Sequence, residues 1–176
     1  MDYAKKLHIE VVPEVDMPGH FVAAMVAYPE LSCDPKADRK VWDHGGVSRD
    51  VLNVANPAAV KLGEDVIDQL AELFPYPYIH IGGDECPTVA WENNADCRAL
   101  MEKEGMKNPR QLQNRFIKQM ADRAAKHGKK LYVWNEALTE EGADSAMLKN
   151  IDATVFCWVA VSYTHLRAHE TLRHLV

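Results

Sequence analysis

The sequence lacks the patterns that mark several large classes of protein. It has no uninterrupted apolar run of about 18 residues, so we expect no transmembrane helix and no membrane partner. The formal net charge is -6 and the basic residues form no stripe, which argues against nucleic-acid binding. No C-x-x-C, H-E-x-x-H, G-x-G-x-x-G, Walker A or G-x-S-x-G motif is present, so zinc ribbons, thioredoxin-like sites and common nucleotide sites are not indicated.

The composition is that of one globular domain. The chain has 176 residues, of which 47% are hydrophobic and 26% charged, enough for a buried core. Its cysteines are Cys33, Cys86, Cys97 and Cys157. Free cysteines are often buried, but a Cys86–Cys97 disulfide remains an alternative. The sequence therefore does not determine the redox compartment. The first residues do not form a signal peptide.

Short runs rich in β-branched and aromatic residues alternate with longer helical stretches. The expected strands are Leu7–Val12, Tyr78–Ile81, Lys130–Trp134 and Ala153–Trp158. The expected helices span Pro18 to Ala27, Asn56 to Leu73, Ala90 to Glu104, Asn108 to His127 and Glu140 to Asn150. This order predicts a parallel α/β arrangement. Tyr28–Ala55 is long for a loop, which suggests a functional loop over a pocket.

The candidate functional residues all follow the carboxyl end of an expected strand. They are Asp16, His20, Asp84, Glu85, Trp134, Glu136 and Trp158. Both (β/α)8 barrels and open α/β sheets bind ligands at this edge. The pattern alone does not separate the two, and four strands are too few to close a barrel.

Asp84 and Glu85 form the most informative pair. The apolar run Tyr78–Ile81 ends in Gly82-Gly83, which lets the backbone turn and both carboxylates face one pocket. Two carboxylates are the minimum for glycoside hydrolysis, and their repulsion would raise the pKa of one of them. The alternative is an exposed acidic turn or a helix N-terminus.

A second constellation holds Asp16 and His20, four residues apart in a turn rich in proline and glycine. The pair suits a proton relay or a hydroxyl-binding site, although a structural histidine explains it equally well. Asp16 and His20 with Glu85 could also hold zinc or manganese, which we consider a minor alternative. His80, in mid-strand, is expected in the core.

The tryptophans divide by position. Trp134 and Trp158 each end a strand, where a flat apolar ring can serve as a sugar platform or pack in the core. Trp91 is expected to be structural. Trp42 lies in the long loop and could line an outer subsite.

The last sixteen residues, 161–176, show no strand and no clear amphipathic period. A histidine-rich metal-binding tail is one interpretation. The string resembles translated sequencing-adapter tails, so we expect a non-native tail and exclude it from fold reasoning. Residues 1–160 are then the part of the chain that bears on the fold.

Four motifs in order resemble the family 20 glycoside hydrolases, the β-N-acetylhexosaminidases. The motifs are Pro13-Glu14-Val15-Asp16-Met17-Pro18-Gly19-His20, Tyr28-Pro29-Glu30-Leu31, His80-Ile81-Gly82-Gly83-Asp84-Glu85 and Val133-Trp134-Asn135-Glu136. The resemblance runs from about Tyr3 to Val159. It implies a (β/α)8 barrel, and residues 1–160 would be a fragment of that catalytic domain, holding roughly strands three to six.

The resemblance also implies a mechanism. Terminal N-acetyl-β-D-hexosamine would be released from oligosaccharides or glycoconjugates with retention, the substrate's 2-acetamido group acting as nucleophile. By motif, Glu85 would be the acid/base and Asp84 would orient the acetamido group. Asp16 and His20 would form a relay behind Glu85, while Trp134 and Trp158 would wall the acetamido pocket. The family mechanism implies no metal and no cofactor.

Other residues of the family's site have no match here. They are a sugar-binding Arg from an early strand, a Tyr that binds the acetamido oxygen, and a late Trp with acidic residues. We therefore expect this stretch alone to be inactive, and an inactive carbohydrate-binding or pseudoenzyme remnant of the fold is the alternative. An unrelated metal-dependent hydrolase using Asp16, His20 and Asp84 is a third hypothesis. The family suggests a secreted, periplasmic or lysosomal location, which the sequence leaves undetermined.

Overall fold

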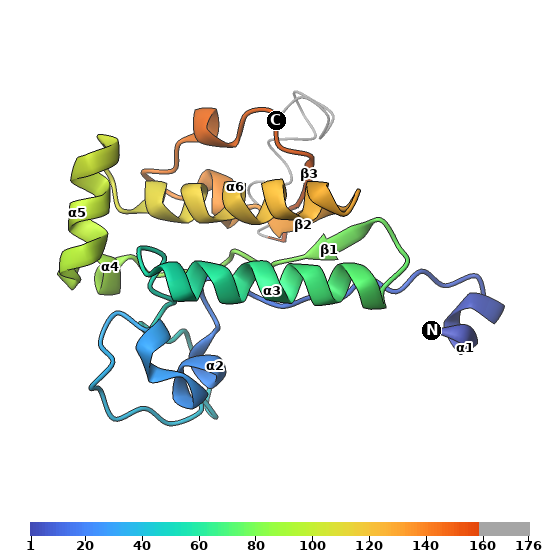
Figure 1. Ribbon diagram of the computed structural model, residues 1–176, viewed down its shortest axis with the longest axis horizontal. Coiled ribbons are helices and arrows are strands. Elements are labelled where there is room, and N and C mark those ends of the chain that lie inside the picture. The colour runs from blue at the N-terminus through green and yellow to red at the C-terminus, as the bar shows by residue number, and fades with distance from the viewer. Residues whose placement is uncertain (159–176) are drawn as a thin grey trace.

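The computed structural model describes residues 1–158 and contains a small parallel sheet (Figure 1). Its strands are β1 (Tyr78–His80), β2 (Lys130–Trp134) and β3 (Ala153–Phe156), hydrogen-bonded in the order β1-β2-β3. Ile79 is opposite Leu131, and Val133 is opposite Val155. The predicted parallel α/β arrangement is confirmed for these strands, whereas the described residues do not form a closed barrel. The predicted tail lies outside the described residues.

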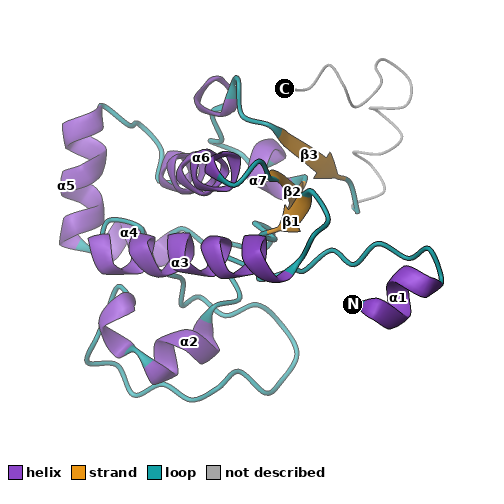
Figure 2. Ribbon diagram, turned by 45° about the vertical axis from the view of Figure 1, so that its right-hand side comes forward, coloured by secondary structure: helices purple, strands orange, loops and turns teal. Residues whose placement is uncertain are grey.

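Helices precede β1 and also occupy the connections between the strands (Figure 2). They are α1 (Asp2–Lys6), α2 (Val22–Ala27), α3 (Pro57–Leu73), α4 (Val89–Asn93), α5 (Ala95–Glu104), α6 (Arg110–Lys126) and α7 (Glu136–Thr139), with 3₁₀ turns η1 (Pro29–Leu31) and η2 (Ser145–Leu148). In Figures 1 and 2, α3 and α6 run side by side, and α5 crosses one end of the pair. No helix of the described residues is long and apolar enough to cross a membrane.

Local signals placed α3 correctly. Asn56 caps the helix by accepting the Ala58 N–H at 2.9 Å, and Pro57 occupies the first turn. Gly63 lies in the middle of α3, where glycine usually weakens a helix. A Cβ there would lie 3.0 Å from the Met120 sulfur and 3.1 Å from Phe116 Cζ, so the glycine lets α3 approach α6 closely.

The predicted first strand, Leu7–Val12, is wrong. Leu7 and Ile9 are more than half exposed, at 52% and 54%, and the chain pairs with β1 only further on. His80 donates its N–H to Pro13 O at 2.9 Å, and Val15 donates to His80 O at 3.1 Å. A segment forms a strand only where a neighbouring strand can pair with it. Here β1 and the residue after it pair with Pro13–Met17, and not with Leu7–Val12.

Two predicted helices are also wrong in outline. The stretch Ala90–Glu104 is broken at Asn94, whose backbone is extended and whose side chain caps α5 by accepting the Cys97 N–H at 3.0 Å. A helix over Glu140–Asn150 does not form. The chain turns into α7 directly after β2, and Asp144 then caps η2 by accepting the Ala146 N–H at 3.0 Å.

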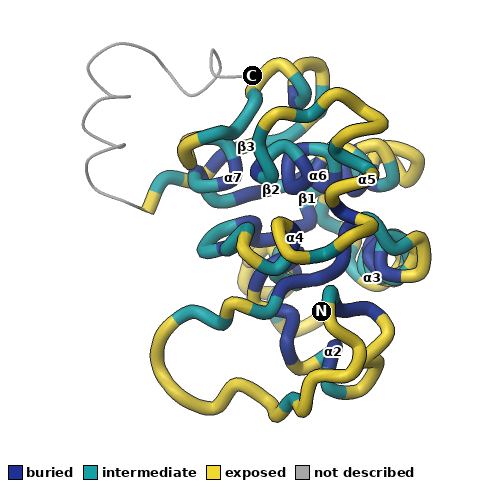
Figure 3. Tube along the Cα trace, turned by 90° about the vertical axis from the view of Figure 1, so that its left-hand side faces the viewer, coloured by how far each residue is buried: buried dark blue, intermediate teal, exposed yellow. Residues whose placement is uncertain are grey.

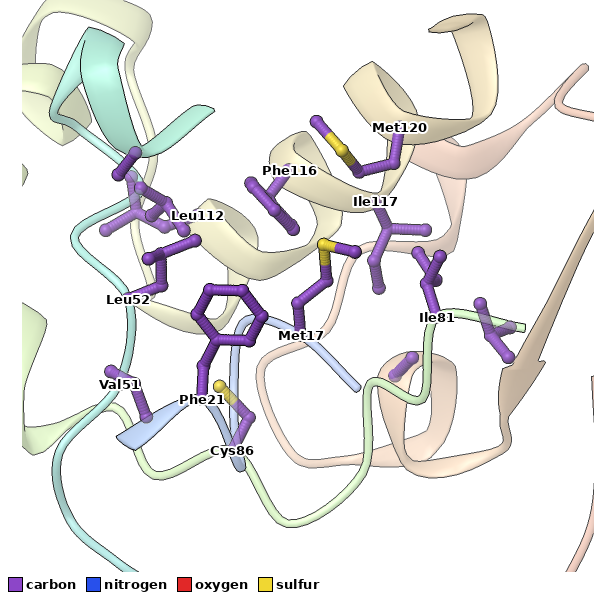
Figure 4. Close-up of a cluster of buried hydrophobic side chains, with 14 of the residues drawn as sticks. Met17, Phe21, Val51, Leu52, Ile81, Cys86, Leu112, Phe116, Ile117 and Met120 are labelled. Carbon is purple, nitrogen blue, oxygen red and sulfur yellow. The ribbon is translucent and has the colours of Figure 1, made fainter. Parts of the chain in front are cut away.

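The core lies between the strands, α3 and α6, whereas the loop beside α2 is mostly exposed (Figure 3). Side chains of α6 meet side chains from the segment before β1 (Figure 4). The buried residues labelled there are Met17, Phe21, Val51, Leu52, Ile81, Cys86, Leu112, Phe116, Ile117 and Met120. Trp91 is fully buried and donates its indole N–H to Leu52 O at 2.9 Å, which confirms its structural role.

The four cysteines are free thiols. The Cys86–Cys97 disulfide left open by the sequence is therefore not formed. Cys97 lies beside Cys33 instead. A hydrogen bond between the two thiols raises the pKa of Cys33 and lowers that of Cys97. Burial raises the pKa of Cys86 to about 12, which keeps this thiol protonated in the core.

One face of the sheet carries a row of rings. Tyr78 stacks on Tyr132 with centroids 4.1 Å apart, and His80 lies 4.8 Å from Trp134. The opposite face turns Val133 toward Ile117 of α6. Of the residues that the sequence marked as functional, Trp134 therefore lies on the ring-bearing face.

Candidate active site

The acid loop, Gly82–Cys86, follows the carboxyl end of β1. Gly82 and Gly83 have φ angles of 67° and 87°, and Glu85 is left-handed as well at 42°. A Cβ on Gly82 would lie 1.8 Å from Asp16 Oδ1, so only glycine fits this position. The glycine pair thus ends the strand and turns the next two residues out of the ladder.

Asp16 is held against this loop. Its Oδ1 accepts the Gly83 N–H at 3.0 Å, although the two residues are 67 positions apart. Burial, followed by the charge of Asp84, raises the pKa of the Asp16 carboxyl to about 8. At neutral pH Asp16 is therefore protonated and can donate a hydrogen bond to Asp84.

His20 lies between the two carboxylates of the acid loop. Its Nε2 is 3.3 Å from Glu85 Oε2 and 3.9 Å from Asp84 Oδ2. The imidazole is one-third exposed, and its backbone is left-handed with φ of 51°. The structure thus brings together all four acid/base residues that the sequence singled out. Asp16, however, contacts Asp84 and Gly83, and of Asp16 and His20 only His20 contacts the Glu85 carboxylate.

Asp84 and Glu85 differ in their surroundings. The Asp84 side chain is 16% exposed, and its Oδ1 is buried without a hydrogen-bond partner among residues 1–158. The Glu85 carboxylate is 36% exposed. A buried acceptor without a donor is unfavourable unless a bound molecule supplies one. Asp84 is therefore suited to bind an N–H or O–H group, and Glu85 to exchange protons with solvent.

His80 is buried, as predicted, with 6% of its surface exposed. Its Nδ1 accepts the Gly82 N–H at 3.0 Å, and burial lowers its pKa, although the Glu14 carboxylate opposes this. Both observations favour a neutral ring. His80 therefore supports the start of the acid loop rather than exchanging protons with a substrate.

The two strand-end tryptophans are fixed in different ways. Trp134 donates its indole N–H to Glu14 Oε1 at 3.0 Å and lies over His80 on the ring-bearing face. Trp158 is 52% exposed and is anchored by its backbone N–H, which donates to Asn135 Oδ1 at 3.3 Å. Trp134 is the last residue of β2, and Trp158 follows the end of β3 by two residues, so both residues lie at the carboxyl edge of the sheet.

The long loop forms a hollow beside His20. The hollow has a volume of about 180 Å³ and is lined by His20, Val22, Ala23, Val41, Trp42 and Ser48. Trp42 is 41% exposed, and its indole N–H donates to Gly46 O at 3.2 Å. Arg39 and Asp50 tie the loop with two hydrogen bonds of 2.9 and 3.1 Å.

Sequence reasoning missed the residues that support the acid loop from behind. Glu136 was noted at a strand end without a role, and Arg110 and Gln113 were not noted. Gln113 donates to Gly83 O at 2.8 Å, and Glu136 accepts the Glu85 N–H at 2.6 Å. A glutamate directly after a strand is a weak signal, and for Arg110 and Gln113 no local signal exists.

Comparison with known proteins agrees with this geometry. The profile of glycosyl hydrolase family 20, catalytic domain, matches residues 1–174, so the chain belongs to this family. A β-hexosaminidase of Porphyromonas gingivalis is 41% identical over 160 residues, which cover 90% of this chain and 19% of that protein. The chain thus spans about a fifth of that relative.

Two solved structures resemble the chain. The Flavobacterium johnsoniae chitobiase has a TM-score of 0.78 at 33% identity and matches 92% of this chain and 23% of its own. A Vibrio harveyi exo-β-N-acetylglucosaminidase in complex with N-acetylglucosamine has a TM-score of 0.77 at 29% identity. This match covers 96% of the present chain and 26% of the V. harveyi chain. These neighbours imply a TIM-barrel-type α/β fold, and they give no support to an inactive remnant.

Proposed function

We propose that this chain supplies the acid/base centre of a glycosidase that removes terminal N-acetyl-β-D-hexosamine from oligosaccharides or glycoconjugates. The observation that carries the proposal is the pairing of Asp84 and Glu85 around His20, with one buried Asp84 oxygen that lacks a donor. The N–H of a 2-acetamido group is such a donor. The names of relatives, among them β-hexosaminidase and chitobiase, support the same substrate class.

The first step breaks the glycosidic bond. The acetamido carbonyl oxygen attacks the anomeric carbon, Glu85 gives its proton to the glycosidic oxygen, and the aglycone leaves. A positively charged oxazolinium ring results. Asp84 accepts the acetamido N–H, holds the carbonyl in line and stabilises the new charge.

The second step returns the enzyme to its starting state. Glu85 takes a proton from water, the water oxygen bonds to the anomeric carbon, and the ring reopens to the acetamide. Two inversions at one carbon give overall retention. No enzyme carboxylate bonds to the sugar, so Glu85 is free to serve as acid and then as base.

Asp16 and His20 support the two carboxylates. His20, at 3.3 Å from Glu85, can hold that side chain and pass protons to solvent. Asp16, whose pKa burial and the Asp84 charge raise, can donate a hydrogen bond to Asp84. Trp134 and Trp158 wall the acetamido pocket, and the described strands correspond to part of strands three to six of a (β/α)8 barrel.

The hollow beside His20 would receive the sugar on the reducing side of the cleaved bond. Supporting this, Trp42 presents an exposed aromatic face next to polar groups, as sugar-binding surfaces do. The hollow opens beside His20, which itself contacts Glu85. The proposed donor of the leaving-group proton therefore lies at the boundary between the two sugar sites.

The test replaces Asp84 with Asn and uses an aryl N-acetyl-β-D-glucosaminide as substrate. Two proteins serve: the full 176-residue chain and a chimaera in which residues 1–158 replace the matching stretch of the P. gingivalis relative. Asp84→Asn in the chimaera should lower kcat by about 100-fold or more. The matched control, Asp122→Asn, changes a 57% exposed aspartate and should leave kcat unaltered. An unchanged rate in Asp84→Asn rules out acetamido participation.

A metal-dependent hydrolase is the second candidate, because one observation favours it. Ligand atoms of Asp16, His20 and Asp84 all lie within 4.8 Å of one another. Metal ligands must be deprotonated, however, so a metal would have to displace the proton that burial and the Asp84 charge favour on Asp16. Dialysis against a chelator decides: loss of activity that zinc or manganese restores would establish the metal site, and full activity would support the substrate-assisted route.

A further inference from the structure

The acid loop has a backbone that neither strand nor helix can stabilise. Gly82, Gly83 and Glu85 all have positive φ, and the left-handed region is unfavourable for a residue with a side chain such as Glu85. Gly82 O still accepts the Trp134 N–H of β2 at 2.9 Å, whereas the loop beyond it leaves the sheet. Buried N–H and C=O groups must nevertheless be paired, so other parts of the molecule have to supply the partners.

Two side chains from the first turn of α6 supply partners on both flanks of the Asp84-Glu85 pair. Gln113 Nε2 donates to Gly83 O at 2.8 Å, directly before Asp84. Arg110 Nη1 donates to Cys86 O at 2.6 Å, directly after Glu85. Arg110 also donates to Gln113 Oε1 at 2.7 Å, which fixes the orientation of the amide that serves Gly83.

These polar groups lie where a core would normally be apolar. Gln113 is fully buried, and Arg110 is 8% exposed. The Arg110 Nε is buried without a hydrogen-bond partner among the described residues, and Nη2 pairs with Glu140 at 3.3 Å. Burying a guanidinium and an amide is unfavourable unless hydrogen bonds compensate for the lost water. Here Cys86 O and Gly83 O of the acid loop are among the groups that compensate.

Glu136 supports Glu85 itself. Its Oε2 accepts the Glu85 backbone N–H at 2.6 Å, a charge-assisted bond to a residue with left-handed backbone. Glu136 begins α7, directly beyond β2, so this contact links the acid loop to the neighbouring strand. The Glu85 side chain remains one-third exposed and free to reach a substrate.

We infer that Gln113 and Glu136, with Arg110 orienting Gln113, are positioning residues that set the directions of the Asp84 and Glu85 carboxylates. The inference rests on the proposed function for its kinetic consequences. Gln113 fixes the peptide that enters Asp84, and Glu136 fixes the peptide that enters Glu85. A displacement of about 1 Å at reacting groups can lower a rate by about 100-fold, so both contacts should matter to turnover.

The first test needs no activity and uses the full chain. Hydrogen exchange of the Glu85 amide is measured in Glu136→Ala, and exchange across the acid loop in Gln113→Leu. Both variants should exchange faster than wild type in the loop, while β2 and α3 stay protected. The control Gln119→Leu alters the same helix at a glutamine that contacts Arg115, and should leave the loop unaltered. Unchanged loop exchange in both variants would overturn the inference.

The second test separates positioning from general stability in the chimaera. Gln113→Glu keeps an acceptor for Arg110 but removes the donor to Gly83 O, and Glu136→Gln keeps an acceptor for Glu85 without the charge. We expect kcat to fall by about 10- to 100-fold in Gln113→Glu and less in Glu136→Gln, with KM nearly constant. A purely structural role would lower the melting temperature and leave kcat of the folded enzyme at the wild-type value.

Failure of the two proposals can be told apart. If the unmodified chimaera does not cleave the aryl N-acetylglucosaminide, the proposed function fails, and the exchange experiment still decides the positioning inference. If the chimaera is active and Gln113→Glu and Glu136→Gln keep full kcat, the positioning inference fails alone.

Discussion

Asp16 and Gly82 lie so close together that the glycine position has no room for a side chain. A Cβ at Gly82 would lie 1.8 Å from Asp16 Oδ1 and 2.1 Å from its Cγ. The same Oδ1 accepts the next backbone N–H, that of Gly83, at 3.0 Å. The carboxyl group thus packs directly on the backbone of the acid loop, and the loop depends on this contact.

Gly82→Ala should therefore destabilise the chain far more than the same change elsewhere. Gly105 is a matched control, since its φ of 68° equals that of Gly82 within a degree and nothing lies within 4 Å of its Cβ position. We expect Gly105→Ala to cost about 1 kcal/mol from backbone strain alone. Gly82→Ala should cost at least about 2 kcal/mol more, because Asp16 must move. Urea denaturation of the full chain measures both, and equal losses would contradict the contact.

Local signals explain which elements the sequence predicted well. Helix α3 was correct because its cap, its proline and its apolar period all lie within the helix itself. Strand β2 was correct because KLYVW is apolar and short. Leu7–Val12 failed because the same kind of run becomes a strand only beside a partner, and β1 lies beside Pro13–Met17 instead.

The candidate site divides in the same way. Asp16, His20, Asp84 and Glu85 were found because family motifs mark them, and the structure brings them together. Gln113 could not be found, since its contact with Gly83 spans 30 positions and no nearby residue signals it. Such contacts follow from how α6 packs under the acid loop, which is decided by tertiary structure.

Asp16→Asn should change how stability depends on pH. The pKa of Asp16 is about 8 in the folded chain and about 3.8 unfolded, so between these values the folded state binds more protons. The free energy of unfolding contributed by Asp16 therefore falls as pH rises from about 4 to about 8. Asparagine does not titrate and can still accept the Gly83 N–H.

The measurement is the difference in unfolding free energy between Asp16→Asn and wild type across this pH range. The variant should gain stability relative to wild type as pH rises, and the gain should level off above about pH 8. Asp122→Asn, at an exposed ion pair with Lys118, should give a flat difference. A flat difference for Asp16→Asn as well would show that its carboxyl titrates like a free one.

Glu85→Gln should affect substrates according to their leaving groups. The amide cannot give a proton to the glycosidic oxygen. For an N-acetylated disaccharide, whose reducing-side sugar is a poor leaving group, kcat/KM should therefore fall by about 100-fold or more. A nitrophenyl glycoside needs little protonation and should lose less in the bond-breaking step. The ratio of the two substrates is measured in the chimaera. An equal loss for both would argue against Glu85 as the general acid.

Trp42→Ala should discriminate between substrates by size. An aryl glycoside places only its aryl group beyond the cleaved bond, whereas a disaccharide places a full sugar ring in the hollow that Trp42 lines. Loss of the indole face should raise KM for the disaccharide by about 10-fold, equivalent to about 1.4 kcal/mol of binding. Turnover at saturation should change little, since Trp42 lies outside the contacts that link His20 with the carboxylates.

Trp42→Phe gives the matched comparison. Phenylalanine keeps an aromatic face but loses the hydrogen bond from the indole N–H to Gly46 O, so it tests stacking separately from anchoring of the loop. If stacking dominates, Phe should restore most of the affinity for the disaccharide. If Phe and Ala raise KM equally, the indole acts by holding the loop through Gly46. If neither variant changes KM for the disaccharide, the reducing-side sugar binds elsewhere, and the hollow beside His20 is not a subsite.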